Sequence, residues 1–145
     1  MKLFYCIHCL GRNKQVNCKH FSNKSKKIIT LICRNCCESY FNVNFLSEIT
    51  ETSRQHIYDI LIKDFNISPK KLINKLRIER SILLFSNDKL KFYEIAEKSG
   101  FQNIRCYRQV FKDFMKHPPM QIREEILQTK HIINITQEYI MKLWI

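Results

Sequence analysis

Glycine and proline are scarce in this sequence, with two Gly and three Pro among 145 residues. Because β-sandwiches and loop-rich scaffolds need these residues for their turns, the composition argues against both. No run of eighteen apolar residues occurs, so we expect no transmembrane helix. The N-terminal apolar stretch is interrupted at His8 and has no small-residue cleavage site after it. We therefore expect no signal peptide and predict a cytoplasmic protein.

Acidic residues are also few, since 13 Asp and Glu stand against 25 Lys and Arg, a formal net charge of +12. Such an excess favours a polyanionic partner, either nucleic acid or an acidic membrane surface. The alternative is a soluble basic protein with no such partner. The hydrophobic fraction of 45% permits a core, and the length suits one medium domain or two small ones.

Cysteine is abundant in one part of the chain, because six of the seven cysteines lie in residues 1–41. Four of them form two Cys-x-x-Cys pairs, Cys6 with Cys9 and Cys33 with Cys36. Four thiolates are a tetrahedral ligand set for zinc, and a segment this small has too little core to fold without such help. The β-branched run at residues 28–32 predicts a strand leading into the second pair. We therefore predict a small N-terminal β-ribbon, resembling a zinc ribbon, that holds one structural Zn²⁺ per chain.

Other assignments of these cysteines stay open. Cys37 is adjacent to Cys36 and can replace it as the fourth ligand, and Cys18 with His20 forms a further candidate pair. A thioredoxin-like redox site is disfavoured because no βαβ pattern surrounds either pair. A site that senses zinc or oxidation uses the same ligands as a structural site.

The first half of residues 42–123 predicts a pair of helices and a long helix after it. Asn42 or Asn44 can cap a short helix, and Ser53 can cap a longer one that ends at Phe65. Ser68-Pro69 then begins a helix that runs to about residue 85, since proline is favoured in the first turn.

The second half of this region predicts another helical pair. A short helix contains Ile95 and Ala96, and Gly100 gives the backbone the freedom that a sharp turn requires. Asn103 can cap the next helix, which ends before Pro118-Pro119. Its apolar residues recur at intervals of three and four: Tyr107, Val110, Phe111 and Phe114.

Residues 53–123 resemble the DNA-binding domain of the AraC/XylS family of bacterial transcription activators. The family's first pattern is represented by Ser53, Ile57, Leu61, Phe65, Ser68-Pro69, Leu76-Arg77 and Glu79-Arg80. The second is represented by Ile95-Ala96, Gly100-Phe101, Tyr107, Val110-Phe111-Lys112, Pro119 and Arg123. The resemblance implies a mainly α fold of tandem helix-turn-helix units joined by a linker helix, over residues 42–123. It also implies binding to double-stranded DNA and not to a membrane, association with the nucleoid, and activation through RNA polymerase.

The sequence departs from this family at several positions. Asn66 and Lys116 stand where the family usually has Gly, and Asp59 stands where many members contact a base or a phosphate. The family's opening helix is not evident before Asn42, because the predicted zinc module occupies that place. A carboxylate repels phosphate. We therefore expect the first helix-turn-helix, which carries Asp59, either to position the protein on DNA or to favour bases with a cytosine amino group.

The candidate DNA contacts lie on the two predicted recognition helices and the linker helix. Arg can bind guanine through two hydrogen bonds, Gln can bind adenine, and an Ile side chain can touch a thymine methyl group. The predicted DNA-binding residues are Arg54, Gln55, Tyr58, Asn103, Ile104, Arg105, Arg108 and Gln109. The predicted phosphate contacts are Lys70, Lys71, Arg77 and Lys112.

Residues 124–145 form an apolar tail, in which Thr136 is expected to cap a last helix. The tail either packs on the protein's own core or forms a dimer or partner surface through residues 126–145. No catalytic residue is predicted, and we expect no enzymatic activity. Two other functions compete: a zinc-dependent interaction or sensing module, and a methyl-accepting DNA repair regulator resembling Ada, whose cysteine motifs differ from those here.

Overall fold

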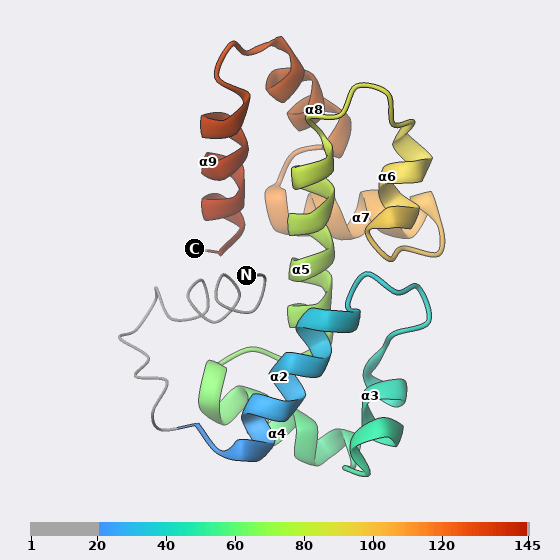
Figure 1. The fold of residues 1–145 in the computed structure, drawn as a ribbon, viewed down its shortest axis with the longest axis vertical. Coiled ribbons are helices and arrows are strands. Elements are labelled where there is room, and N and C mark those ends of the chain that lie inside the picture. The colour runs from blue at the N-terminus through green and yellow to red at the C-terminus, as the bar shows by residue number, and fades with distance from the viewer. Residues whose placement is uncertain (1–20, 145) are drawn as a thin grey trace. The chain divides into compact units, whose positions relative to one another are not determined.

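The computed structural model describes residues 21–144, which form eight α-helices and no strand (Figure 1). The helices are α2 (Asn23–Asn35), α3 (Val43–Thr50), α4 (Arg54–Phe65), α5 (Pro69–Leu84), α6 (Phe92–Lys98), α7 (Ile104–Met115), α8 (Pro119–Gln128) and α9 (Ile132–Trp144). Among the described residues, 21–36 and 40–73 form one compact unit, which we call unit 1. Residues 37–39 and 74–144 form a second, unit 2.

Unit 1 is built from α2, α3, α4 and the start of α5, and its first three helices pack against one another. Its core is mainly aliphatic, with one fully buried ring, and each of the following side chains is at most 1% exposed: Ile28, Ile29, Ile32, Phe41, Leu46, Ile57, Leu61 and Leu72. Ser25 of α2 donates a hydrogen bond to Asp64 of α4, which adds a polar link between two helices of the unit. Helix α2 is therefore an integral part of this core.

Helix α2 corrects two predictions. Residues 28–32 were expected to form a strand of a β-ribbon, and no helix was expected before Asn42; both expectations are wrong. The buried residues Ser25, Ile28, Ile29 and Ile32 follow the 3.6-residue period of a helix. Ser22 caps the helix by accepting the Ser25 N–H at 3.0 Å. Periodic burial has thus prevailed over the β propensity of the branched side chains.

The predicted helix ends of unit 1 are confirmed. The Asn42 side chain accepts the N–H groups of Asn44 and Phe45 at the start of α3, and Ser53 accepts that of His56 at the start of α4. Asn66 ends α4 with φ 54°, in the left-handed region. Helix α5 begins at Pro69, and Ser68 precedes it.

Unit 2 is organised around the aromatic side chains of α7. The ring centroid of Tyr107 lies 5.5 Å from Phe92, 5.2 Å from Phe101 and 5.7 Å from Phe111. Gly100, with φ 91°, makes the turn between α6 and α7. Tyr107, Phe111 and Met115 are buried, whereas the predicted core residues Val110 and Phe114 are only half-buried.

A buried arginine holds the turn that precedes α6. The Arg123 guanidinium on α8 donates to the carbonyl oxygens of Asn87 and Leu90 at 3.0 and 2.6 Å. These carbonyls belong to the turn between α5 and α6. Helix α8 thereby ties that turn into unit 2, so Arg123 has a structural role in this fold.

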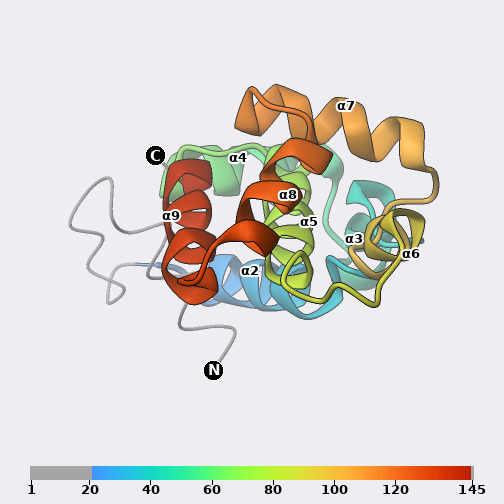
Figure 2. The same cartoon turned by 90° about the horizontal axis from the view of Figure 1, so that it is seen from above.

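Helix α9 returns to pack against α7 and α8 (Figure 2). It begins at Ile132, so the expectation that Thr136 caps it is wrong, and Thr136 is buried inside the helix. Tyr139, Leu143 and Trp144 are also buried, which confirms that the tail packs on the protein's own core. None of the helices that the structure describes is long and apolar enough to cross a membrane.

Candidate nucleic-acid interface

Helix α4 presents a polar face. Its predicted DNA-binding residues Arg54, Gln55 and Tyr58 are all exposed, and Tyr58 retains 44% of its accessible surface. The opposite face buries Ile57 and Leu61 in unit 1. The helix therefore separates a packing face from a face that is free to meet a ligand.

Two of these side chains are held by neighbours within unit 1. Gln55 Nε2 donates to Asp59 Oδ1 at 2.8 Å, and Arg54 Nη1 donates to Asn44 Oδ1 at 3.2 Å. The Gln55 amide keeps its oxygen and its second N–H for another partner. Asp59 therefore contacts Gln55, a predicted DNA-binding residue, and also adds a negative charge to the exposed face of α4.

Helix α7 presents the second polar face. Arg105, Arg108 and Gln109 are exposed, and Ile104 is half-buried. Asn103 accepts the Cys106 N–H at 2.7 Å, which confirms its capping role and leaves the amide nitrogen as its group for DNA. The N-terminal turns of a recognition helix are the part that approaches base edges in the major groove.

Two residues of α7 are oriented by contacts within unit 2. The Arg108 guanidinium carbon lies 5.5 Å from the centroid of the Phe92 ring, and Gln109 Nε2 donates to Asp113 Oδ1 at 2.8 Å. The Gln109 bond repeats the one between Gln55 and Asp59, because in both helices an acid follows the glutamine by four residues. This spacing was a signal in the sequence that the prediction of DNA contacts did not use.

The predicted phosphate contacts fall into two groups. Lys70, Lys71 and Lys112 are exposed, as a phosphate contact requires. Arg77 is half-buried, and its Nη2 donates to the Glu38 carbonyl at 3.0 Å while its guanidinium lies 5.7 Å from the centroid of Phe101. Arg77 therefore takes part in holding unit 2 together, and its role at DNA stays a prediction.

The predicted zinc ligands are only partly described. Cys33 lies in the last turn of α2 and is half-buried, and Cys36 is the C-cap of that helix and is buried. Residues three apart on a helix lie on neighbouring parts of its surface, so this pair is spaced to share one ion. Cys6 and Cys9, like Cys18 and His20, lie outside the described residues. Within 21–144 no group of three or more candidate ligands occurs.

Glu79 of α5 is a half-buried carboxylate, and its contacts were not predicted from the sequence. Trp144 Nε1 of α9 donates to Glu79 Oε2 at 2.6 Å, and Lys75 Nζ lies 5.1 Å from the centroid of the Trp144 ring. Burial raises the pKa of the Glu79 carboxyl above its ordinary value, and the hydrogen bond from Trp144 partly opposes this. All three residues belong to unit 2, where they join the appended tail to the linker helix.

Comparison with known proteins gives a consistent result. Residues 46–125, more than half of the chain, match the family described as Helix-turn-helix domain. The Msm operon regulatory protein of Streptococcus mutans is 32% identical over 108 residues, which cover 74% of this chain and 37% of that protein. An uncharacterized HTH-type transcriptional regulator of Haemophilus influenzae is 23% identical over 86 residues, 59% of this chain and 29% of that protein. This chain thus spans about a third of the length of these curated relatives.

Two solved structures resemble the chain. One is the C-terminal domain of the two-component response regulator yesN from Fusobacterium nucleatum, with a TM-score of 0.66, 30% identity, and coverage of 70% of this chain and 99% of that one. The other is the C-terminal domain of AraT, a response regulator from Geobacillus stearothermophilus, with a TM-score of 0.71, 21% identity, and coverage of 77% and 93%. The second likeness bears on the fold alone.

Proposed function

The chain belongs to the AraC-type helix-turn-helix family of DNA-binding transcriptional regulators, and from this premise we propose that it reads a specific duplex sequence through α4 and α7. The observation that carries the proposal is the presence of two capped helices with exposed Arg and Gln faces, each after a shorter helix. Arginine and glutamine are the side chains best suited to guanine and adenine edges in the major groove. The net charge of +12 supplies the attraction to phosphate.

Replacing Arg105 with alanine tests this assignment. We expect a loss of about 1–3 kcal/mol in binding to the specific site, roughly 5- to 150-fold in Kd, because a base-edge contact disappears. Affinity for random duplex should fall far less. The measurement is fluorescence anisotropy at fixed salt, on a site first selected from the host genome.

The matched control is Lys130→Ala, which removes the same charge from an exposed position outside α4 and α7. It should weaken specific and random binding alike and only slightly. If Arg105→Ala behaves as Lys130→Ala does, Arg105 is not a reader of bases.

We further propose that binding activates an operon by contact with RNA polymerase. Two facts support this: a relative is named for regulating an operon, and the family resemblance implies activation. Transcription in vitro from the bound promoter should rise when the chain is added. A fall would make the protein a repressor instead.

We also propose that one structural Zn²⁺ is bound by Cys6, Cys9, Cys33 and Cys36. The spacing of Cys33 and Cys36 at the end of α2 fits two ligands of such an ion. The ion would tie the N-terminal residues to the end of this helix. It would add stability without being required for the helix itself, since the buried face of α2 packs in unit 1.

A further inference from the structure

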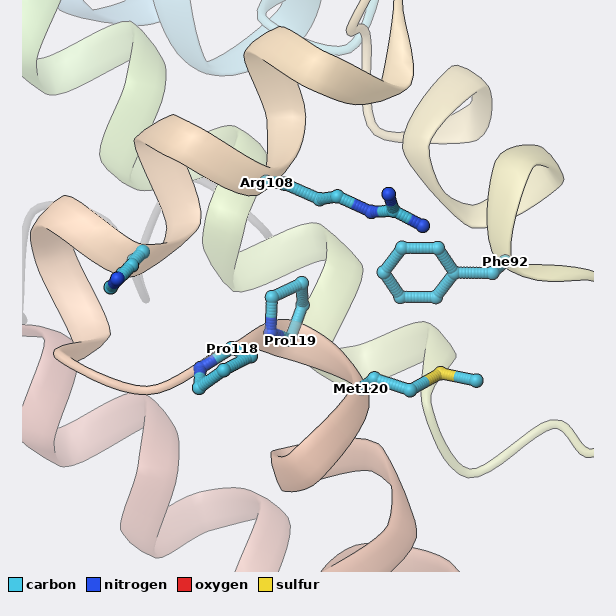
Figure 3. Close-up of a pocket in the computed structure, with 6 residues that line it drawn as sticks. Phe92, Arg108, Pro118, Pro119 and Met120 are labelled. Carbon is cyan, nitrogen blue, oxygen red and sulfur yellow. The ribbon is translucent and has the colours of Figure 1, made fainter.

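A cavity of about 370 Å³, open to solvent on one side, lies beside α7 within unit 2. Six residues line it: Phe92, Arg108, Lys112, Pro118, Pro119 and Met120. Figure 3 shows the Arg108 side chain reaching over the ring of Phe92, with Pro119 and Met120 facing the same space from the start of α8. The site thus combines two cations of one helix with apolar walls from two other segments.

Contact with DNA does not account for the apolar part of this cavity. Met120 is 49% exposed although its thioether offers nothing to a phosphate group. The ring of Phe92 is half-buried and positions the Arg108 guanidinium at 5.5 Å. Apolar walls with a few placed charges, in a volume of this size, are typical of small-molecule sites.

We propose that this cavity binds a small organic anion, namely a carboxylate carried by an aromatic or short aliphatic body. Arg108 and Lys112 are four residues apart on α7, so both face the same side and can approach one carboxylate. Asp113, the one acidic residue of α7, does not line the cavity and accepts a hydrogen bond from Gln109 instead. The body of the ligand would lie against the prolines and the Met120 thioether, which favours aromatic rings.

One consequence rests on the proposed function. Arg108 is a predicted DNA contact and also lines the cavity. Its guanidinium group would therefore bind either DNA or the carboxylate of the ligand. A ligand that holds Arg108 would weaken specific DNA binding, and DNA would weaken ligand binding by the same factor. The cavity would then act as an effector site on the DNA-binding domain.

The test uses methionine methyl NMR of the full chain, because Met120 lines the cavity and Met141 of α9 is equally exposed, at 51%, without lining it. Sodium phenylacetate is the probe, phenylacetamide is its neutral counterpart, and sodium chloride matches the ionic strength. We expect a saturable shift of the Met120 methyl with phenylacetate alone, with a Kd below about 1 mM. The proposal is overturned if Met120 does not respond, or if phenylacetamide shifts it equally, or if Met141 shifts in parallel.

Variants separate this inference from the proposed function. Lys112→Gln should weaken phenylacetate binding at least about fivefold, whereas Lys130→Gln should not change it. Met120→Glu places a carboxylate in the cavity and should abolish the binding measured by calorimetry, while the exposed position leaves folding intact. If phenylacetate binds as expected but the chain recognises no DNA, the cavity stands and the proposed function fails. If DNA is bound specifically and phenylacetate is not, the cavity proposal fails alone.

Discussion

Three residues other than glycine occupy the left-handed backbone region at the ends of helices: Glu51, Asn66 and Lys116, with φ of 49°, 54° and 63°. The family usually has Gly at the last two positions. A side chain with a Cβ atom costs about 1 kcal/mol or more there, and Asn costs less than Lys because its short polar group tolerates this conformation. The structure thus explains these departures as tolerated strain at helix C-caps.

Lys116→Gly is therefore expected to stabilise the protein. Lys116 also donates from Nζ to the Asp113 carbonyl at 2.8 Å, so the net gain should be below about 1 kcal/mol, or roughly 2–4 °C in Tm. Asn66→Gly, measured beside it by thermal denaturation, should give a smaller gain. An equal or larger gain at Asn66 would contradict the explanation.

At the level of single residues, the sequence predicted backbone features better than side-chain contacts. The caps Asn42, Ser53 and Asn103 were predicted because their chemistry is local, and the structure confirms each. The contact of Arg108 with Phe92 was not predicted, since it joins residues on different helices and depends on their packing. The predicted DNA contacts depend further on a partner, and they stay predictions.

Among the elements, α2 shows how local propensity misleads. Its isoleucines resemble a strand in composition, and its cysteines suggested a ribbon, yet the spacing of Ser25, Ile28 and Ile32 was helical throughout. The two Cys-x-x-Cys pairs suggested a zinc-binding β-ribbon instead of a helix. A count of matches to both periodicities would have favoured the helix.

The zinc proposal is tested at this element. Cys33→Ser should abolish one equivalent of bound zinc, because three thiolates hold the ion more weakly than four. Cys37→Ser is the matched control, since Cys37 is half-buried as Cys33 is and should leave the zinc content unchanged. Elemental analysis of the purified chain gives the zinc content, and circular dichroism should show that α2 stays helical in both variants.

Two results would contradict this set of ligands. If the wild-type chain binds no zinc even when it is prepared with the metal in excess, the proposal fails altogether. If Cys37→Ser loses zinc and Cys33→Ser retains it, the ion is bound by a different set of ligands that includes Cys37.

Helix α9 is joined to α5 through a carboxyl whose pKa is raised, which predicts a dependence of stability on pH. In the folded state Glu79 keeps its proton to a higher pH than in the unfolded chain, where its pKa is near 4.5. The native state then binds more protons, so the free energy of unfolding decreases as pH rises from about 4.5 through the raised pKa. The charged carboxylate is the less stable form within unit 2.

Glu79→Gln should remove this part of the pH dependence, because the amide oxygen still accepts the Trp144 N–H but cannot ionise. Urea denaturation between pH 4.5 and 7 is the measurement. The variant should gain stability over the wild type as pH rises, and the same change at exposed Glu97 should not. If the difference in stability between Glu79→Gln and the wild type does not vary with pH, Glu79 is not the source of the pH dependence.

For the whole molecule, the tandem helix-turn-helix architecture was predicted from the sequence, and the family match confirms it. The spacing of apolar residues, caps and turn residues determined most helices of residues 42–123. The packing of α9 was predicted only as one of two alternatives, because an apolar tail has the same composition in a core and in an interface. Its exposed residue Ile133, at 73%, shows that only one face of that helix is used within unit 2.

The last prediction concerns how the two recognition helices divide the work of binding DNA. Each carries a Gln that donates to an Asp four residues later, but Asp59 is the sixth residue of α4 while Asp113 is the tenth of α7. The N-terminal part of a recognition helix is the part nearest to DNA. We therefore expect Asp59 to repel phosphate more strongly than Asp113 does, and α7 to be the main reader of the sequence.

Asp59→Asn should raise affinity for random duplex, and the slope of log K against log salt should become steeper, because a repulsive charge is removed. Asp113→Asn removes an equal charge farther from the reading end and should change both quantities less. Anisotropy titrations over a range of salt concentrations measure both variants. If Asp59→Asn instead lowers affinity only for sites with one particular base pair, Asp59 reads that base pair itself, as an acceptor for a cytosine amino group.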